Sequence, residues 1–278
     1  MLRKLLPVLI LIITAWRSVA VADTKRDVHL HTTDNVDITG TYYPVSQTSA
    51  PSALLLHSVY RSRAVWDDFC GLLQQSGIAA FAIDLRGHGD STRKLTAAGP
   101  VTLDAHEFTG TDFQDMPLDV EAAIDWMDAQ PELDKTRIAL IGESVGANVA
   151  LRYAAINPDI AALVLFSPGL DYRSVRTDDA ILQIGHMPVR IFVSEFDPVA
   201  FASCKHLVDI QKEAGISSAT NELIICTGNI HGSDMLQRVR YLPQIVVAWL
   251  NQVFKRGPKS SATPTNATPS RATAPPAK

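Results

Sequence analysis

Ser144, Asp197 and His231 are the residues whose types and order point to nucleophilic catalysis. Ser144 is the centre of Gly142-Glu143-Ser144-Val145-Gly146, a Gly-x-Ser-x-Gly pattern. A serine nucleophile needs a base to take its proton, and the base needs an acid to orient it and to stabilise its charged form. Asp197 and His231 follow the serine in the order nucleophile, acid, base. The sequence therefore predicts acyl transfer through a covalent intermediate.

The segment around Ser144 has the local structure that this chemistry requires. Residues 138–141 are an apolar run typical of a buried strand, and residues 145–153 carry apolar side chains at helical spacing. A serine at so sharp a strand-to-helix turn needs residues without side chains two positions before and after it. On the pentapeptide alone, a turn with a serine cap is an equal alternative. The flanking strand and helix favour a nucleophile at the positive end of the helix.

Two other acidic residues compete with Asp197 for the role of the acid. Asp197 follows the predicted strand 189–194 and is followed by Pro198. Glu195 lies at the same strand end, and Asp171 follows the preceding strand. We favour Asp197 because it lies farther into the loop and is braced by the proline.

His231 is the preferred base because it lies in the loop after the last predicted strand, residues 222–226. Ligands of open parallel sheets bind where loops leave the carboxyl ends of the strands. The competing histidines are His57, His88, His106, His186 and His206. His206 falls inside a predicted helix, whereas His57 and His88 precede the serine and are expected to brace loops beside the site.

A tetrahedral intermediate needs two backbone N–H donors for its oxyanion. The amide of Val145, directly after the nucleophile, is the first. The second is expected from the loop after the first parallel strand, where Ser58 and Val59 are the alternatives. The sequence does not choose between them.

The rest of the chain predicts the frame that positions these residues. Residues 28–32 and 36–43 alternate apolar and polar side chains around a turn and predict an antiparallel hairpin. Further short apolar strands are expected at 53–57, 78–85, 138–141, 161–166, 189–194 and 222–226, and helices at 63–75, 112–129, 145–153, 200–213 and 235–254. Strands that alternate with helices predict the α/β class, with a mostly parallel central sheet and helices on both faces.

The two ends of the chain are expected to lie outside this fold. Residues 1–22 have a basic start, an apolar run and Ala20-Val21-Ala22, which predict a secretory signal peptide. The apolar run is short for a membrane anchor, so cleavage and a secreted or periplasmic location are favoured. Residues 257–278 are rich in Pro, Ser, Thr and Ala and predict a disordered tail. The folded domain is expected to span residues 23–256.

Composition excludes several other classes of protein. The chain has 278 residues, 46% of them hydrophobic, and a formal net charge of −4. No basic excess suggests nucleic acid. The three cysteines have no zinc-binding spacing and are expected to be free thiols. Nothing in the sequence indicates a metal or an organic cofactor, and the oligomeric state is left open.

Five motifs make the chain resemble the α/β-hydrolase superfamily, and its small esterase and lysophospholipase-like branch in particular. They are LLLHS (54–58), IDLRGHGDS (83–91), GESVG (142–146), EFDP (195–198) and IHG (230–232). The similarity covers about residues 36–254. Relatives commonly have His-Gly where this chain has His57-Ser58, which bears on the second oxyanion donor. The segment 167–188 is short, so a small lid or none is expected.

The resemblance implies a serine hydrolase that cleaves small-molecule carboxylic esters through an acyl-enzyme. A peptidase or thioesterase with the same three residues is an alternative within enzymes. A non-catalytic binding protein on the same fold is an alternative of a different class, since fold does not imply function. A binding role would not need Ser144, Asp197 and His231 together.

Overall fold

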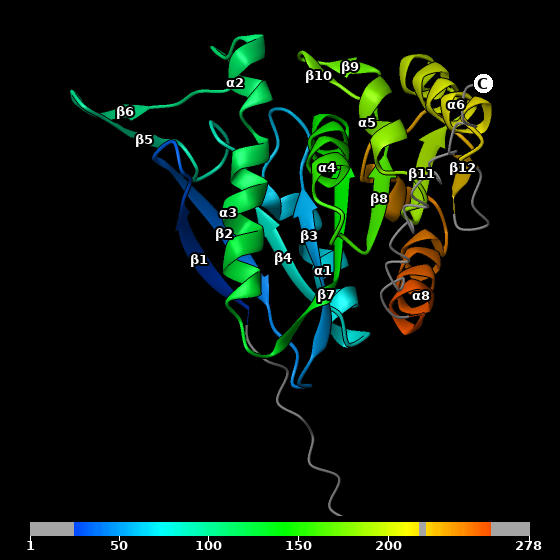
Figure 1. Cartoon of the computed structure of the whole chain (residues 1–278), viewed down its shortest axis with the longest axis horizontal. Coiled ribbons are helices and arrows are strands. Elements are labelled where there is room, and N and C mark those ends of the chain that lie inside the picture. Colours follow the sequence, from blue (N-terminus) through cyan, green and yellow to red (C-terminus); the bar gives the residue numbers. More distant parts are fainter. Residues whose placement is uncertain (1–24, 217–220, 257–278) are drawn as a thin grey trace, which may run out of the picture.

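A computed structural model describes residues 25–216 and 221–256 (Figure 1). The predicted signal peptide (1–22) and the predicted tail (257–278) lie outside the described residues. Within the described ranges, no helix is both long enough and apolar enough to cross a membrane. The same ranges contain no group of three or more His, Cys, Asp or Glu residues arranged to hold a metal ion.

A mixed ten-stranded sheet forms the centre of the molecule (Figure 1). Its order is β12 (Glu222–Cys226), β11 (Val189–Ser194), β8 (Ala162–Phe166), β7 (Leu133–Glu143), β3 (Ala50–Leu56), β4 (Ala79–Ile83), β2 (Val36–Tyr43), β5 (Arg93–Thr96) and β6 (Gly99–Thr102), with β1 (Arg26–His31) paired to β2. The six strands from β12 to β4 are parallel to one another, and β1 and β2 form the expected antiparallel hairpin.

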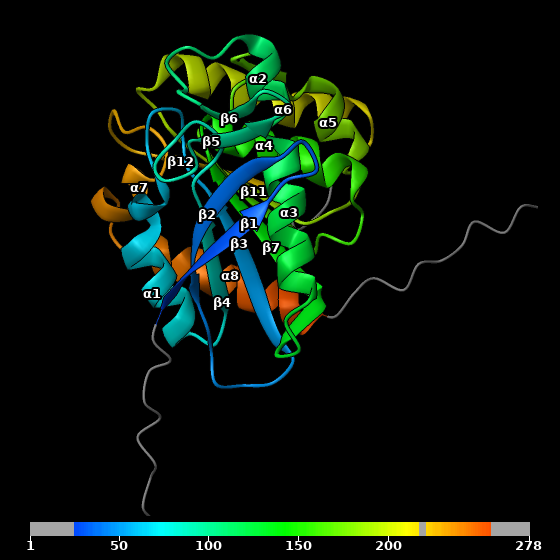
Figure 2. The same ribbon diagram turned by 90° about the vertical axis from the view of Figure 1, so that its left-hand side faces the viewer.

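Helices cover both faces of this sheet, as the strand and helix pattern predicts (Figures 1 and 2). One face packs against α2 (Gly110–Gln114), α3 (Pro117–Asp128), α4 (Val145–Ile156), α5 (Asp178–Gln183) and α6 (Pro198–Glu213). The other packs against the 3₁₀ turn Arg63–Trp66, α1 (Asp67–Gln75), α7 (Asp234–Arg238) and α8 (Leu242–Lys255).

The all-apolar strands are explained by this burial on two sides. In β3, Leu54 and Leu56 belong to the core under α3 and α4, whereas Leu55 belongs to the core under α1 and α8. Successive side chains of a strand point to opposite faces, so a strand with a core on each face needs apolar residues at every position. The three cysteines, Cys70, Cys204 and Cys226, are free and buried in these cores.

Two predicted helices are each divided in the structure. The segment 112–129 becomes α2 and α3, which are separated at Asp115 and Met116 because Pro117 begins a new helix. Proline has no N–H to donate, and its ring clashes with the preceding helical turn. The segment 235–254 becomes α7 and α8, because Tyr241 adopts a left-handed conformation (φ 63°) immediately before α8.

The segments beyond the carboxyl ends of the parallel strands are short. Residues 93–102 form the β5–β6 hairpin, which the sequence did not predict and which extends the sheet beside β2. Residues 167–188 contain a two-stranded ribbon, β9 (Asp171–Tyr172) with β10 (Val175–Arg176), followed by α5. Figure 1 shows this ribbon and α2 at the same end of the molecule. This small cover agrees with the expected small lid.

Candidate active site

Ser144 lies on the tight turn between β7 and α4, as its sequence context predicts. Its backbone has φ 51° and ψ −120°, a conformation that a residue with a side chain rarely adopts. Its side chain is nearly buried, with 8% of the residue exposed. Strain of this kind persists only where the surrounding structure enforces it, and such positions cluster at functional sites.

The two glycines of the pattern allow the turn to pack against its neighbours. A Cβ atom on Gly142 would lie 2.4 Å from the carbonyl oxygen of Gly146. A Cβ atom on Gly146 would lie 2.5 Å from the carbonyl oxygens of both Leu56 and His57, at the end of β3. Distances below 3.0 Å to backbone atoms leave no room for a side chain. The Gly-x-Ser-x-Gly spacing thus follows from contact between the turn and β3.

Asp197 and His231 are brought together from the loops after β11 and β12. The Oδ2 atom of Asp197 lies 2.6 Å from Nδ1 of His231. The other carboxylate oxygen accepts the Ala200 amide at 3.4 Å and caps α6. The Asp197 side chain is 13% exposed, whereas that of His231 is 47% exposed. A carboxylate held in this way fixes the ring orientation and leaves Nε2 for proton transfer.

The competing acids are held in other ways. Glu195 is exposed, and its Oε1 atom accepts the Gly228 amide at 3.3 Å. Asp171 is also exposed, and it accepts the Ser174 amide at 2.9 Å within the β9–β10 ribbon. The geometry therefore favours Asp197 as the partner of the histidine.

A hydrogen bond and a ring contact hold the loop that carries His231. The amide of Gly232 donates to Oγ of Ser167, which follows β8, at 3.1 Å. The ring of Tyr172 stands edge-on to the imidazole, with the ring centres 6.4 Å apart. Burial, together with the negative charge of Asp197, raises the pKa of Tyr172 above its usual value. The phenol therefore stays protonated beside the histidine.

His57 has the structural role that was expected of it. Its Nδ1 atom lies 2.7 Å from the Ser58 carbonyl oxygen, and its Nε2 atom accepts the Leu85 amide at 3.0 Å. This pairing fixes a neutral tautomer that joins the ends of β3 and β4. Burial, reinforced by the neighbouring His88, lowers the pKa of His57 from 6.5 to about 3. His57 therefore cannot serve as a base that cycles near neutral pH.

One hydrogen bond distinguishes between the two candidates for the second oxyanion donor. The amide of Ser58 donates to Oε1 of Glu143 at 3.0 Å and is therefore already engaged. This contact argues against Ser58 and favours Val59, the other alternative from the sequence. Val145 is the first residue of α4, where backbone N–H groups have no partner within the helix.

Glu143 is a residue of the site that the sequence analysis missed. It is the last residue of β7, directly before the nucleophile, and its side chain is 1% exposed. Besides the Ser58 amide, its carboxylate accepts the Ser233 amide at 2.7 Å and lies 3.6 Å from Nη1 of Arg61. The available signal was a charged residue close after the apolar run of residues 138–141, because such a charge must find partners when buried.

Of two pockets formed by the described residues, neither is lined by Ser144, Asp197 or His231. The smaller one, about 370 Å³, includes Tyr60 and Arg61 from the loop that carries Val59. It is also lined by His88, whose buried Nε2 atom has no hydrogen-bond partner within the described ranges. This pocket opens at the carboxyl edge of the sheet, beside the proposed oxyanion donor.

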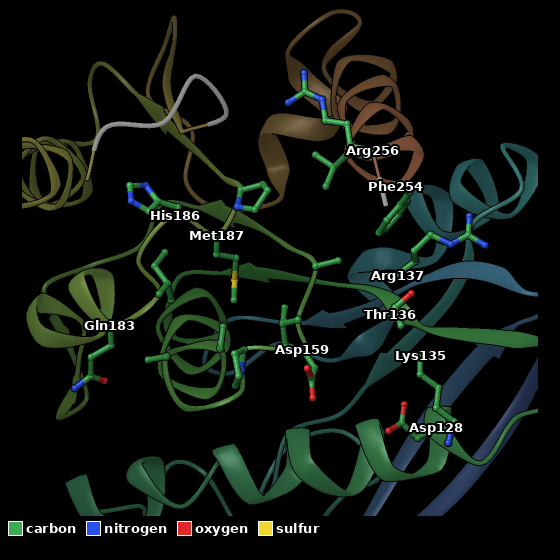
Figure 3. Close-up of a pocket in the computed structure, with 18 residues that line it drawn as sticks. Asp128, Lys135, Thr136, Arg137, Asp159, Gln183, His186, Met187, Phe254 and Arg256 are labelled. Atoms are coloured by element: carbon green, nitrogen blue, oxygen red, sulfur yellow. The ribbon is translucent and has the colours of Figure 1, made fainter. Parts of the chain in front are cut away.

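The larger pocket, about 860 Å³, lies at the opposite edge of the sheet (Figure 3). Its walls come from the start of β7, the segments that lead into β8 and β11, and the end of α8. Figure 3 shows Lys135, Asp159, His186 and Phe254 around it. Because parallel strands carry their catalytic loops at the carboxyl ends, we assign this pocket no part in the chemistry at Ser144.

The sequence matches a known enzyme family over just over half of its length. Residues 50–196 match the serine aminopeptidase family S33, whose members are α/β hydrolases. The chain belongs to this family. The matched region contains Ser144 and ends one residue before Asp197. The family assignment supports a hydrolase, and it agrees with the superfamily predicted from the sequence motifs.

Curated relatives match only part of the chain. An uncharacterized protein of Mycobacterium tuberculosis is 31% identical over 150 residues, which are 54% of this chain and 47% of that protein. A polyketide transferase from a Penicillium species is 26% identical over 149 residues, or 53% of this chain and 46% of the relative. The chain thus matches about half the length of these relatives.

Solved structures show the same fold over most of the chain. An α/β hydrolase from a Penicillium species superimposes with a TM-score of 0.67 at 15% identity, over 84% of this chain and 99% of that one. An esterase from Pyrococcus furiosus gives a TM-score of 0.64 at 19% identity, over 84% and 91% of the two chains. These similarities confirm the α/β-hydrolase fold.

The lowered pKa of His57 predicts a pH-dependent loss of stability that removal of this histidine should reduce. The unfolded chain binds a proton below about pH 6.5, whereas the folded protein excludes it down to about pH 3. The contribution of His57 to the free energy of unfolding is therefore fully present above pH 6.5. It falls as the pH is lowered, by roughly 2–3 kcal/mol at pH 4.5. Urea unfolding at pH 7.5 and 4.5 should show a smaller loss in His57→Gln than in wild type.

Glutamine retains both a donor and an acceptor for the neighbours of His57. His206→Gln, on the exposed side of α6, is the matched control and should lose as much stability as wild type. Equal pH dependence in His57→Gln and wild type would contradict the assignment.

Proposed function

We propose that the protein is a serine hydrolase that cleaves carboxylic esters of small molecules. The observation that carries this proposal is the 2.6 Å contact between Asp197 and His231. It joins the loops after β11 and β12, at the edge of the sheet where Ser144 stands on its strained turn. Membership of a hydrolase family supports the same chemistry.

In the proposed reaction, Oγ of Ser144 attacks the ester carbonyl carbon while Nε2 of His231 takes the hydroxyl proton. The imidazolium gives this proton to the leaving alcohol as the bond from carbon to alkoxide oxygen breaks, which leaves an acyl-serine. Water then attacks the acyl carbon while His231 takes its proton, and the imidazolium returns that proton to Oγ of Ser144 as the acyl–serine bond breaks and the carboxylic acid leaves. The amides of Val145 and Val59 stabilise the oxyanion in both steps.

Cleavage of an amide or thioester, or transfer of the acyl group to an acceptor other than water, is the second candidate. The family is named for serine aminopeptidases, and one partial relative is named a polyketide transferase. Ester, amide and thioester cleavage share the acyl-enzyme and differ in the leaving group and the acceptor. The short cover over residues 167–188 favours small or flexible acyl groups over long buried chains.

We also propose that the enzyme acts outside the cytoplasm, after removal of residues 1–22. Arg3 and Lys4 followed by an apolar run and Ala20-Val21-Ala22 support this proposal.

Replacement of the nucleophile should abolish both covalent labelling and turnover. We expect wild type to react with a fluorophosphonate and to hydrolyse p-nitrophenyl acetate or butyrate. Ser144→Ala should lose the label, and its kcat should fall by about 10³-fold or more. Labelling of wild type without ester turnover would favour an amide or thioester substrate. Absence of labelling in folded wild-type protein would contradict the enzyme proposal.

The two strand-end carboxylates should differ sharply in their effect on catalysis. Asp197→Asn keeps the shape of the side chain but removes the charge that orients and stabilises the imidazolium, so kcat/KM should fall by about 10²- to 10⁴-fold. Glu195→Gln retains an acceptor for the Gly228 amide and should stay within about twofold of wild type. A larger loss in Glu195→Gln than in Asp197→Asn would reverse the assignment of the acid.

Cleavage of the signal peptide should leave Asp23 as the first residue. The full-length chain can be expressed in a bacterial host, and the intact mass of the exported protein can be measured. A mass that begins at Asp23, in the periplasm or the medium, is expected. The full-length mass in the membrane fraction would instead identify residues 1–22 as an anchor.

A further inference from the structure

The carboxylate of Glu143 connects three segments that are far apart in the sequence. We define the oxyanion loop as residues 57–62 and the base loop as residues 227–233. From the end of β7, Glu143 accepts the Ser58 amide of the oxyanion loop at 3.0 Å and the Ser233 amide of the base loop at 2.7 Å. Its partners are 85 and 90 residues away along the chain.

We infer that Glu143 is a positioning residue that holds both loops in place around Ser144. The inference rests on the proposed function, in which the oxyanion loop supplies the Val59 amide and the base loop supplies His231. Glu143 is next to the nucleophile in the chain, so its side chain sets both loops relative to the turn itself. A displacement of either loop by about 1 Å costs an enzyme much of its rate.

The chemistry of this side chain suits the task. An ionised carboxylate has two oxygens that both accept hydrogen bonds, so each oxygen of Glu143 serves one loop. The two bonds are buried, with the side chain 1% exposed, and a buried amide that loses its acceptor destabilises the loop that carries it. A glutamine of the same shape offers one acceptor and one donor, so one of the two amides would face an N–H group.

The base loop is shaped to lie directly on this carboxylate. Gly232, the residue after His231, has φ 63°, and a Cβ atom there would lie 2.4 Å from Oε2 of Glu143. The absence of a side chain lets the backbone approach closely enough for the Ser233 amide to donate. The same oxygen therefore limits the position of His231 through its neighbour in the chain.

Arg61 balances the charge of the buried carboxylate. Its Nη1 atom lies 3.6 Å from Oε2 of Glu143 and donates to Asp234 at 2.9 Å. A buried anion needs a cation and hydrogen bonds to offset the loss of water. With Arg61 and two amides around it, Glu143 can stand beside the nucleophile without strongly opposing the negative charge of the oxyanion.

Glu143→Gln tests this inference with a readout of the loops and a readout of the reaction. Amide hydrogen exchange should become faster in peptides that cover at least one of the two loops, because the glutamine leaves one of the two amides without an acceptor. In ester hydrolysis, kcat should fall by about 10- to 100-fold with KM within about twofold, since the loops act on the transition state. Glu121→Gln, the same change at an exposed position of α3, is the control and should alter neither quantity.

Gly232→Ala disturbs the same contact from the base loop, and it replaces Glu143→Gln as the test if that variant fails to fold. Its added methyl group displaces the carboxylate, so exchange in the oxyanion loop should rise as well. Unchanged exchange in both loops of Glu143→Gln, unchanged exchange in the oxyanion loop of Gly232→Ala, or an unchanged kcat in an active enzyme would overturn the inference. If wild type neither labels nor hydrolyses esters, the proposed function fails, and the exchange data still decide whether Glu143 holds the two loops.

Discussion

The close contact between the turn at Ser144 and the end of β3 is the constraint on which the site depends. The carbonyl oxygens of Leu56 and His57 lie where a side chain at residue 146 would have to be placed. Glycine at 142 and 146 permits this contact, and the contact in turn holds Ser144 in its unusual backbone conformation. Because β3 and β7 are adjacent and parallel, the same packing brings the oxyanion loop beside the nucleophile.

The remaining groups reach this edge because six adjacent strands are parallel. Their carboxyl ends face one way, so Asp197 after β11 and His231 after β12 emerge on the side of Ser144. Each is then fixed locally, Asp197 as the cap of α6 and His231 by the bonds of Gly232 and Ser233. Regular sheet geometry thus supplies the approximate positions, and side-chain hydrogen bonds supply the final ones.

Features governed by local patterns could be predicted from the sequence. The apolar strands, the turn at Ser144 and the pairing of Asp197 with His231 follow from burial on both faces, glycine spacing and chain order. The divided helices at Pro117 and Tyr241 were missed because helical spacing of apolar residues continued across both breaks. A proline in the first turn of a helix was the sign of both breaks, Pro117 in α3 and Pro243 in α8.

The role of Glu143 was not predictable because its partners are backbone amides, which every non-proline residue carries. Nothing in the side chains of Ser58 or Ser233 identifies them as donors, and only the folded sheet brings them within 3.0 Å and 2.7 Å of one carboxylate. Because any backbone amide can donate, one carboxylate beside a strained turn can hold two short loops. A charge buried once, and matched by Arg61, gives two loops of unrelated sequence a common point of attachment next to the nucleophile.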